Sequence, residues 1–229
     1  MIEIPTLSHD GAFPAHRADP QGSPRAAIIV IQEIFGVNQG VRNRCERLAS
    51  LGYLAIAPDL FWRLEPGVEL DPDVPEQFQQ ALGLMNRFDQ EQGVRDIEAA
   101  IRFAREASGG GKVGAVGYCL GGRLAFMAAA RTDVNASVGY YGVGLEGLLG
   151  EKHAIAHPLM LHIAQNDHFV TPDKQAQIHA GLDDHPKVTI HDYPGVDHGF
   201  ASDEGQRRDE EAAKLADSRT EAFFAENIG

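Results

Sequence analysis

Cys119 lies between Gly117 and Gly121, each two residues away, where the sequence changes from a strand pattern to a helix pattern. Strand, nucleophile and helix in this order form a nucleophile elbow. The glycines leave room for the chain to reverse. The start of the following helix stabilises a thiolate and offers backbone N–H groups to an anion. A buried cysteine in a glycine-rich turn fits the same pattern, so a catalytic assignment needs partner residues.

Two such partners follow Cys119 in the chain, each just after a predicted strand: Asp167 and His198. Nucleophile, acid and histidine occur in this order in α/β-hydrolases. We therefore expect His198 to take the thiol proton and Asp167 to orient the imidazole and stabilise its charged form. Asp173 and Asp197 compete for the place of the acid, and Asp167 is preferred because it directly follows a strand.

A tetrahedral intermediate at the thiol also needs two N–H donors. Leu120, directly after the nucleophile, supplies one, and Ile34, in the loop after an earlier strand, is the candidate for the other. Glu33 is unusual beside them, because a carboxylate near an active-site thiol opposes a negatively charged sulfur. It is either a solvated loop residue, a group that keeps the resting thiol protonated, or an acceptor of its proton until substrate arrives.

A parallel sheet is needed to bring these residues together. Apolar runs alternate with helical patterns, which predicts an α/β fold whose mostly parallel sheet has helices on both faces. Sites in such sheets form beyond the carboxyl ends of the strands. The predicted strands are 26–31, 53–58, 112–117, 136–141, 157–164 and 188–193. The predicted helices are 39–51, 76–88, 93–107, 120–131, 172–182 and 205–225.

The remaining segments are predicted to be irregular. Residues 2–25 form edge strands and turns, and 142–150 is a glycine-rich connection. The Pro- and Asp-rich stretch 60–75, which carries the single tryptophan Trp62, is typical of an active-site rim. Cys45 falls on the apolar stripe of its helix and is expected to be a core residue.

The composition narrows the class of protein. The 229 residues suit one domain, 1–229, and 43% hydrophobic with 23% charged residues is ordinary for a soluble globular chain. A net charge of −13, from 33 acidic residues against 20 Lys and Arg, disfavours nucleic-acid binding. Two cysteines predict neither a disulfide framework nor a structural zinc site. With no secretory signal and no apolar run of about 18 residues, a cytoplasmic location without membrane contact is expected.

His153 and His157 have the i,i+4 spacing of a helical metal site. They lack the glutamate of the zinc-peptidase motif, so we expect no metal and no other cofactor.

Several segments together resemble the dienelactone hydrolase family over essentially the whole chain. They are QEIFGVN at 32–38, APDL at 57–60, GAVGYCLGG at 114–122, GYYGVG at 139–144 and DHFV at 167–170. The resemblance implies an α/β-hydrolase fold and a triad of Cys119, His198 and Asp167. It further implies that Glu33 pairs with the cysteine and that the oxyanion donors are the two backbone positions named above. The reaction implied is the cofactor-free opening of an unsaturated lactone to maleylacetate.

The sequence departs from this family at two positions. Enzymes of this type hold a substrate carboxylate with one arginine in the helical segment after the Pro-rich loop and another four residues beyond the catalytic histidine. Phe78 and Ser202 stand at or near those positions here. Because such a clamp depends on a fixed guanidinium, a neutral or bulkier ester or lactone is expected. Phe78, Ser202, Phe35 and Tyr141 are the predicted substrate contacts.

The leading interpretation is an ester or lactone hydrolase that forms an acyl-thioester. A glutamine amidotransferase also places a cysteine on such an elbow, but it draws its acid from two residues after the histidine, where Phe200 stands. A non-catalytic ligand-binding module of the same fold is the third reading, which the apparently complete triad disfavours. The expected partner is a small-molecule ester or lactone, and the expected assembly is a monomer or weak dimer.

Overall fold

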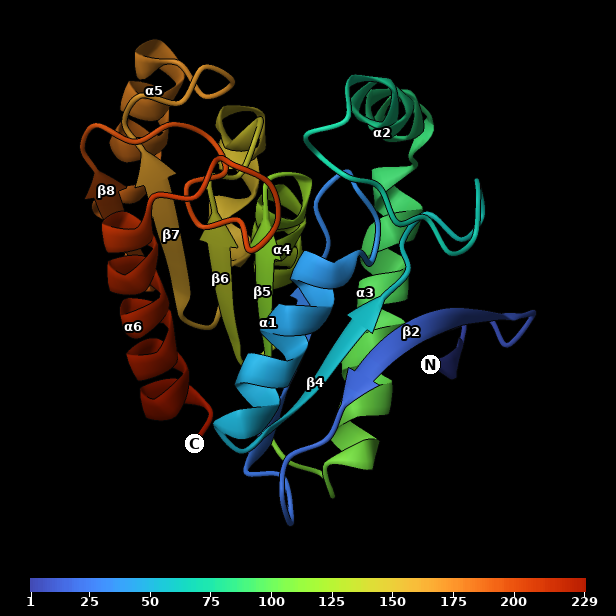
Figure 1. Cartoon of the computed structure of the whole chain (residues 1–229). Helices are drawn as coiled ribbons and strands as arrows, with labels where there is room; N and C mark the ends of the chain where they lie inside the picture. Colours follow the sequence, from blue (N-terminus) through green and yellow to red (C-terminus); the bar gives the residue numbers. More distant parts are fainter.

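The computed structural model describes residues 1–229 and contains one eight-stranded sheet in the order β1-β2-β4-β3-β5-β6-β7-β8 (Figure 1). The N-terminal β1 and β2 pair antiparallel with each other, and β2 pairs antiparallel with β4. All other neighbours are parallel. The strands are β1 (Ile2–Pro5), β2 (Ala12–Ala18), β3 (Ala26–Ile31), β4 (Tyr53–Pro58), β5 (Val113–Tyr118), β6 (Ala136–Tyr140), β7 (Leu159–Ala164) and β8 (Val188–Tyr193).

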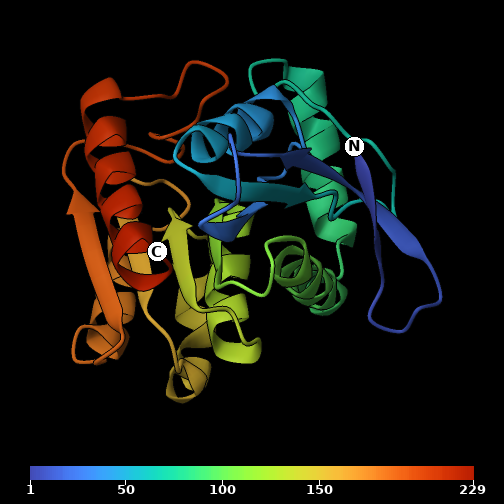
Figure 2. The same cartoon turned by 90° about the horizontal axis from the view of Figure 1, so that it is seen from below.

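Helices cover both faces of the sheet, as predicted (Figure 2). Residues of α1 and α6 share one apolar cluster with the sheet, and residues of α3 and α4 share the other. The helices are α1 (Gln39–Ser50), α2 (Pro75–Arg87), α3 (Gln90–Ala107), α4 (Leu120–Arg131), α5 (Pro172–Leu182) and α6 (Glu210–Asn227), with the 3-10 helix η1 (Leu145–Ala154).

Successive side chains of a strand point to opposite faces of the sheet, so one buried apolar run contributes to the cores on both faces. In β3, Ile29 and Ile31 belong to the cluster under α3 and α4, whereas Ile28 and Val30 belong to the cluster under α1 and α6. All four side chains are fully buried. A continuous β-branched run is therefore what a central parallel strand requires, and the prediction for this strand is confirmed.

Capping residues account for where the helices begin. Asn38 caps α1 as predicted, with its Oδ1 accepting from Val41 N–H at 3.2 Å. Helix α3 begins at Gln90 rather than at 93, because Asp89 caps it. Helix α6 begins at Glu210 rather than at 205, because Asp209 accepts from the N–H of Ala212. In both cases an aspartate side chain supplied the start signal.

The glycine-rich connection 142–150 contains the start of the 3-10 helix η1, an element that was not predicted from the sequence. Gly144 adopts φ +77° directly before this helix, and Leu145 and Leu148 are buried. Short 3-10 turns lack the apolar period of an α-helix, so the sequence pattern gave no sign of this one.

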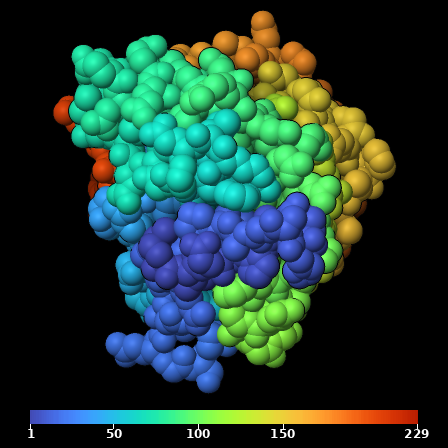
Figure 3. Space-filling view, turned by 90° about the vertical axis from the view of Figure 1, so that its right-hand side faces the viewer, coloured from blue at the N-terminus to red at the C-terminus, as the bar shows by residue number.

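The N-terminal hairpin of β1 and β2 forms a band across one side of the molecule, next to the segment around 60–85 (Figure 3). None of the helices is long and apolar enough to cross a membrane.

Candidate active site

Cys119 occupies a strained turn between β5 and α4. Its backbone adopts φ 56° and ψ −115°, a conformation that non-glycine residues rarely take and that costs about 1–3 kcal/mol. The N–H of Cys119 donates to the carbonyl of Tyr140 at 3.0 Å, which ties the turn to the neighbouring strand. This turn places the sulfur at the amino end of α4, where the helix dipole favours a negative charge.

The two flanking glycines are sterically required. A Cβ on Gly117 would lie 1.9 Å from the carbonyl oxygen of Gly121, and one on Gly121 would lie 2.4 Å from that of Ile31. Both contacts are with backbone atoms, which cannot swing away. The sequence pattern around the cysteine thus reflects the close approach of α4 to the ends of β3 and β5.

Asp167 and His198 meet across the carboxyl ends of β7 and β8. The Nδ1–H of His198 donates to Asp167 Oδ2 at 2.8 Å, and both side chains are buried. The other oxygen of Asp167 accepts from the N–H groups of Phe169 and Val170 at 2.8 and 3.1 Å. Because one carboxylate is fixed at both oxygens, the imidazole is held in one tautomer and one orientation.

Asp197, one of the two alternatives for the acid, makes different hydrogen bonds. Asp197 accepts from the ring and the backbone of His168, and its Oδ1 also accepts from the backbone N–H of His198 at 2.6 Å. It therefore shapes the loop that carries His198 without touching the imidazole ring. Asp173, the other alternative, lies in the first turn of α5.

The second nitrogen of His198 has no partner in the protein. Its Nε2 is buried without a hydrogen bond. Tyr141 and Phe169 pack edge-on against the ring, with centroid distances of 5.0 and 4.8 Å. Burial alone lowers the pKa of His198, but the Cys119 sulfur and Asp167 outweigh it and raise the pKa from 6.5 to about 10. The site therefore favours an imidazolium next to the sulfur.

Glu33 lies in the same cleft as Cys119 and His198. It is 7% exposed, and the one cation in ion-pairing range is Arg44, whose Nη1 lies 4.0 Å from its Oε2. The reading of this residue as a solvated loop group does not match its burial.

The backbone positions predicted as oxyanion donors flank the cysteine. Helix α4 begins at Leu120, so the N–H of this residue has no intrahelical acceptor. Ile34 lines the cleft with Cys119 and is 5% exposed.

The cleft is lined mainly by apolar side chains, and its empty space, including the part open to solvent, is about 440 Å³. Phe35 and Phe78, two of the predicted substrate contacts, pack against each other within it, with 5.9 Å between their ring centroids. Leu82 and Met85 of α2 extend the same wall. This lining suits an apolar ligand held by a few polar groups.

Two other predicted contacts lie outside the lining. Ser202 is buried, and its hydroxyl donates to the carbonyl of Glu204 at 2.8 Å. Tyr141 is also buried and supports the ring of His198 from behind, with a backbone φ of 38°. Its hydroxyl has no hydrogen-bond partner.

The sequence analysis missed Arg207, the one arginine or lysine that lines the cleft. Its guanidinium lies 5.6 Å from the centre of the Phe35 ring. Arg207 comes nine residues after His198 rather than four, in the same loop. Reading that loop for any long cation, instead of for one fixed spacing, would have found it.

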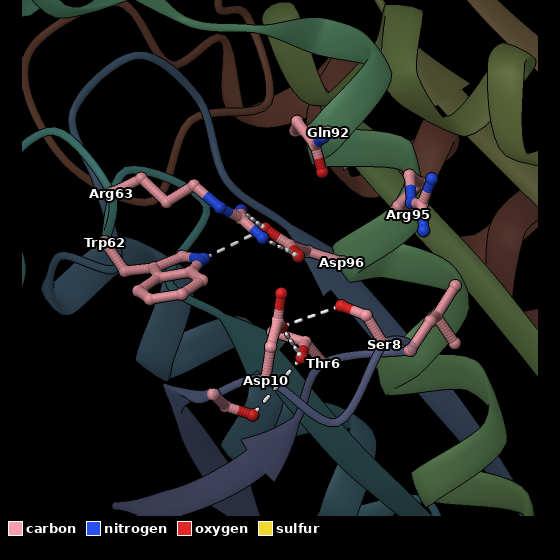
Figure 4. Close-up of a pocket in the computed structure, with 10 residues that line it drawn as sticks. Thr6, Ser8, Asp10, Trp62, Arg63, Gln92, Arg95 and Asp96 are labelled. Carbon is pink, nitrogen blue, oxygen red and sulfur yellow. Dashed lines mark hydrogen bonds and ion pairs between the residues drawn. The ribbon is translucent and has the colours of Figure 1, made fainter.

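A second, larger cavity of about 990 Å³ lies away from these residues, beside the N-terminal hairpin (Figure 4). Its charged groups largely bind one another: Arg63 pairs with Asp96, and Asp10 accepts from Thr6 and Ser8. It contains neither a cysteine nor a histidine.

A metal site has little support from the geometry. His153 lies on η1, and neither it nor His157 belongs to a cluster of three possible ligands. The cluster that does form is Asp167, His168 and Asp197, whose donors are already engaged in the hydrogen bonds described above.

The sequence and the fold are similar to those of several known proteins. Residues 13–228 match the family model described as "Dienelactone hydrolase family". A protein named putative carboxymethylenebutenolidase from Azospirillum brasilense is 46% identical, covering 100% of this chain and 99% of its own. A carboxymethylenebutenolidase from Pseudomonas putida is 43% identical over 97% and 95% of the two chains. The crystal structure of a putative dienelactone hydrolase from Klebsiella pneumoniae superposes with a TM-score of 0.84 at 30% identity, covering 97% and 96%.

The sheet order, the elbow and the strand-end loops define an α/β-hydrolase. Within that class the chain belongs to the dienelactone hydrolase family, and it is an enzyme of that type.

Proposed function

We propose that this enzyme hydrolyses carboxylic esters or lactones through an acyl-thioester on Cys119. The observation that carries the proposal is one cleft that contains a thiol at a strained helix start and the unbonded Nε2 of a histidine fixed by Asp167. Nucleophile, base and orienting acid are the three parts that covalent acyl transfer needs.

In the first step the Cys119 sulfur attacks the acyl carbon, and the carbonyl oxygen becomes an oxyanion. The N–H groups of Ile34 and Leu120 stabilise that charge. The C–O bond to the alcohol then breaks, and the imidazolium of His198 gives its proton to the departing oxygen. For a lactone, the released hydroxyl stays attached to the acyl group.

In the second step the neutral His198 takes a proton from water, and the resulting hydroxide attacks the thioester carbon. The C–S bond breaks, the acid leaves, and the proton held by His198 restores the charged pair with the thiolate. Asp167 keeps the imidazole oriented through both steps.

The cleft supports a compact acyl group with apolar substituents. Phe78, Leu82 and Met85 offer aromatic and aliphatic contacts, and Arg207 offers one guanidinium at the Phe35 side. A single cation fits either a neutral ester or a substrate with one carboxylate, and we propose that Arg207 raises the affinity for the latter.

Replacement of Cys119 tests the proposal. We expect Cys119→Ala to lower kcat/KM on a simple aryl ester by about 10,000-fold or more, the range seen when a covalent nucleophile is removed. Cys45→Ala is the matched control, because Cys45 is a fully buried core thiol of α1 and its loss should leave turnover near wild type. Undiminished turnover by Cys119→Ala contradicts the proposal.

The same assay separates the alternatives. Stoichiometric labelling of Cys119 without any ester turnover favours a non-catalytic binding module. An amidotransferase would cleave glutamine, and the position two residues after His198 is a buried phenylalanine, Phe200, rather than an acid. The monomeric or weakly dimeric state and the cytoplasmic location stay predictions.

A further inference from the structure

Arg44 of α1 is a charged side chain in the interior, 1% exposed. Its guanidinium carbon lies over the ring of Tyr118, 3.5 Å from the ring centroid. Its Nη2 donates to the carbonyl of Ala201 at 3.1 Å, and its Nε lies 3.6 Å from Asp203 Oδ2. The remaining nitrogen, Nη1, faces Glu33 at 4.0 Å.

These contacts connect three parts of the active site. Tyr118 immediately precedes the cysteine, Ala201 and Asp203 lie in the loop after the catalytic histidine, and Glu33 lies in the loop after β3. A buried guanidinium is unfavourable unless anions and acceptors surround it. Burial here opposes the charge of Arg44, but the anionic groups around it outweigh burial and raise its pKa.

The two carboxylates near Arg44 depend on it to different degrees. Asp203 also approaches Arg208 at 2.8 Å and Arg47 at 3.5 Å, so it has other cations. Glu33 has no other ion-pairing partner. Glu33 therefore depends on Arg44 alone for a nearby positive charge, whereas Asp203 does not.

We propose that Arg44 is a positioning residue for the hydrolysis: it balances the charge of Glu33 and fixes that carboxylate beside Cys119, so that carboxylate and thiolate coexist in one site. This inference rests on the proposed function, in which Cys119 is the nucleophile. Without Arg44, two neighbouring groups compete for negative charge, and one of them keeps a proton to higher pH. The groups that face Glu33 are Arg44 from α1, Cys119 from the elbow, Tyr141 after β6, and His198 and Arg207 from the loop after β8.

The test is the pH dependence of kcat/KM in a cycle of Arg44→Met, Glu33→Gln and the double variant. For Arg44→Met we expect the acidic limb of the profile to move up by about one pH unit, a tenfold change in proton affinity. The rate of Cys119 alkylation by iodoacetamide should move in parallel. In the Glu33→Gln background the same substitution should leave the limb in place, because the competition is gone.

Arg47→Met is the matched control on the same helix. Arg47 also contacts Asp203 but does not approach Glu33, so its profile should match wild type. If Arg44→Met does not fold, Arg44→Gln takes its place, since it removes the charge but keeps a hydrogen-bond donor. An unshifted profile in a folded Arg44 variant, or an equal shift with and without Glu33, overturns the inference. Cys119→Ala that keeps full activity instead overturns the proposed function itself.

Discussion

The polar cavity beside the N-terminal hairpin is more than twice the size of the cleft at Cys119, about 990 against 440 Å³. Its buried carboxylate, Asp96, is engaged by Arg63 and by the Trp62 indole N–H at 2.9 Å. In the smaller cleft, the Nε2 of His198 is buried and unbonded, and Cys119 is held in a strained backbone conformation. The presence of oriented polar groups without partners, rather than the volume of a cavity, therefore distinguishes the candidate active site.

Asp167→Asn should give the largest effect of the substitutions that probe this contrast. The amide can donate to Nδ1 and so favours the wrong tautomer, and we expect kcat/KM to fall by about 1,000-fold. The matched control is Asp197→Asn, because Asp197 bonds the backbone but not the ring of His198. Equal losses in the two variants, measured with one aryl ester, would show that Asp167 has no special role.

The pKa of His198 provides a second test of the cleft at Cys119. Its pKa is raised from 6.5 to about 10, so the ring should stay protonated through neutral pH. A raised pKa in the folded state stabilises the protein fully below 6.5, and this contribution is lost as pH rises through about 10. Cys119→Ala removes one cause, so imidazole ¹⁵N signals should titrate at lower pH, by about one unit or more. An unchanged titration in Cys119→Ala would mean that sulfur and ring do not interact.

A smaller effect is expected at Arg207, the one arginine or lysine of the cleft. Arg207→Gln should raise KM for a substrate with a carboxylate by about tenfold while changing that for a neutral aryl ester by less than about twofold. Side-by-side assays of cis- and trans-dienelactone and neutral esters measure this. A uniform change for all substrates would place Arg207 in folding rather than in recognition.

The smallest effect is expected in the polar cavity. Arg95 lines it, is exposed, and makes no ion pair, so Arg95→Ala should change kcat/KM by less than about twofold and leave thermal stability within the range of ordinary surface substitutions. A tenfold loss of turnover would break the contrast between the cavities.

Most of the fold was predictable because its signals are local. Continuous β-branched runs gave the parallel strands, and the glycines at 117 and 121 gave the elbow through steric necessity. Asp167 and His198 could be paired from sequence because parallel strands bring their carboxyl ends to one edge. The resemblance to the family added the prediction that Glu33 pairs with the cysteine.

The rest depended on where long side chains end, which spacing does not determine. Arg207 reaches the cleft from a loop whose path sets its position, and Ser202 turns instead to the backbone of Glu204. Arg44 could not be recognised, because a charged residue on a helix is normally solvated. Its burial results from contacts with the end of β5, the loop after β3 and the loop after β8. The aspartate caps of α3 and α6 were present in the sequence but were passed over.

Intact-mass spectrometry of the enzyme quenched with acid during turnover tests most directly whether Cys119 forms an acyl-thioester. With a slowly deacylating aryl ester, wild-type enzyme should gain the mass of one acyl group, and peptide mapping should place it on Cys119. Cys119→Ala should gain none, whereas Cys45→Ala should gain it normally. Steady turnover with no adduct, or with the acyl group on another residue, would show that Cys119 is not the nucleophile.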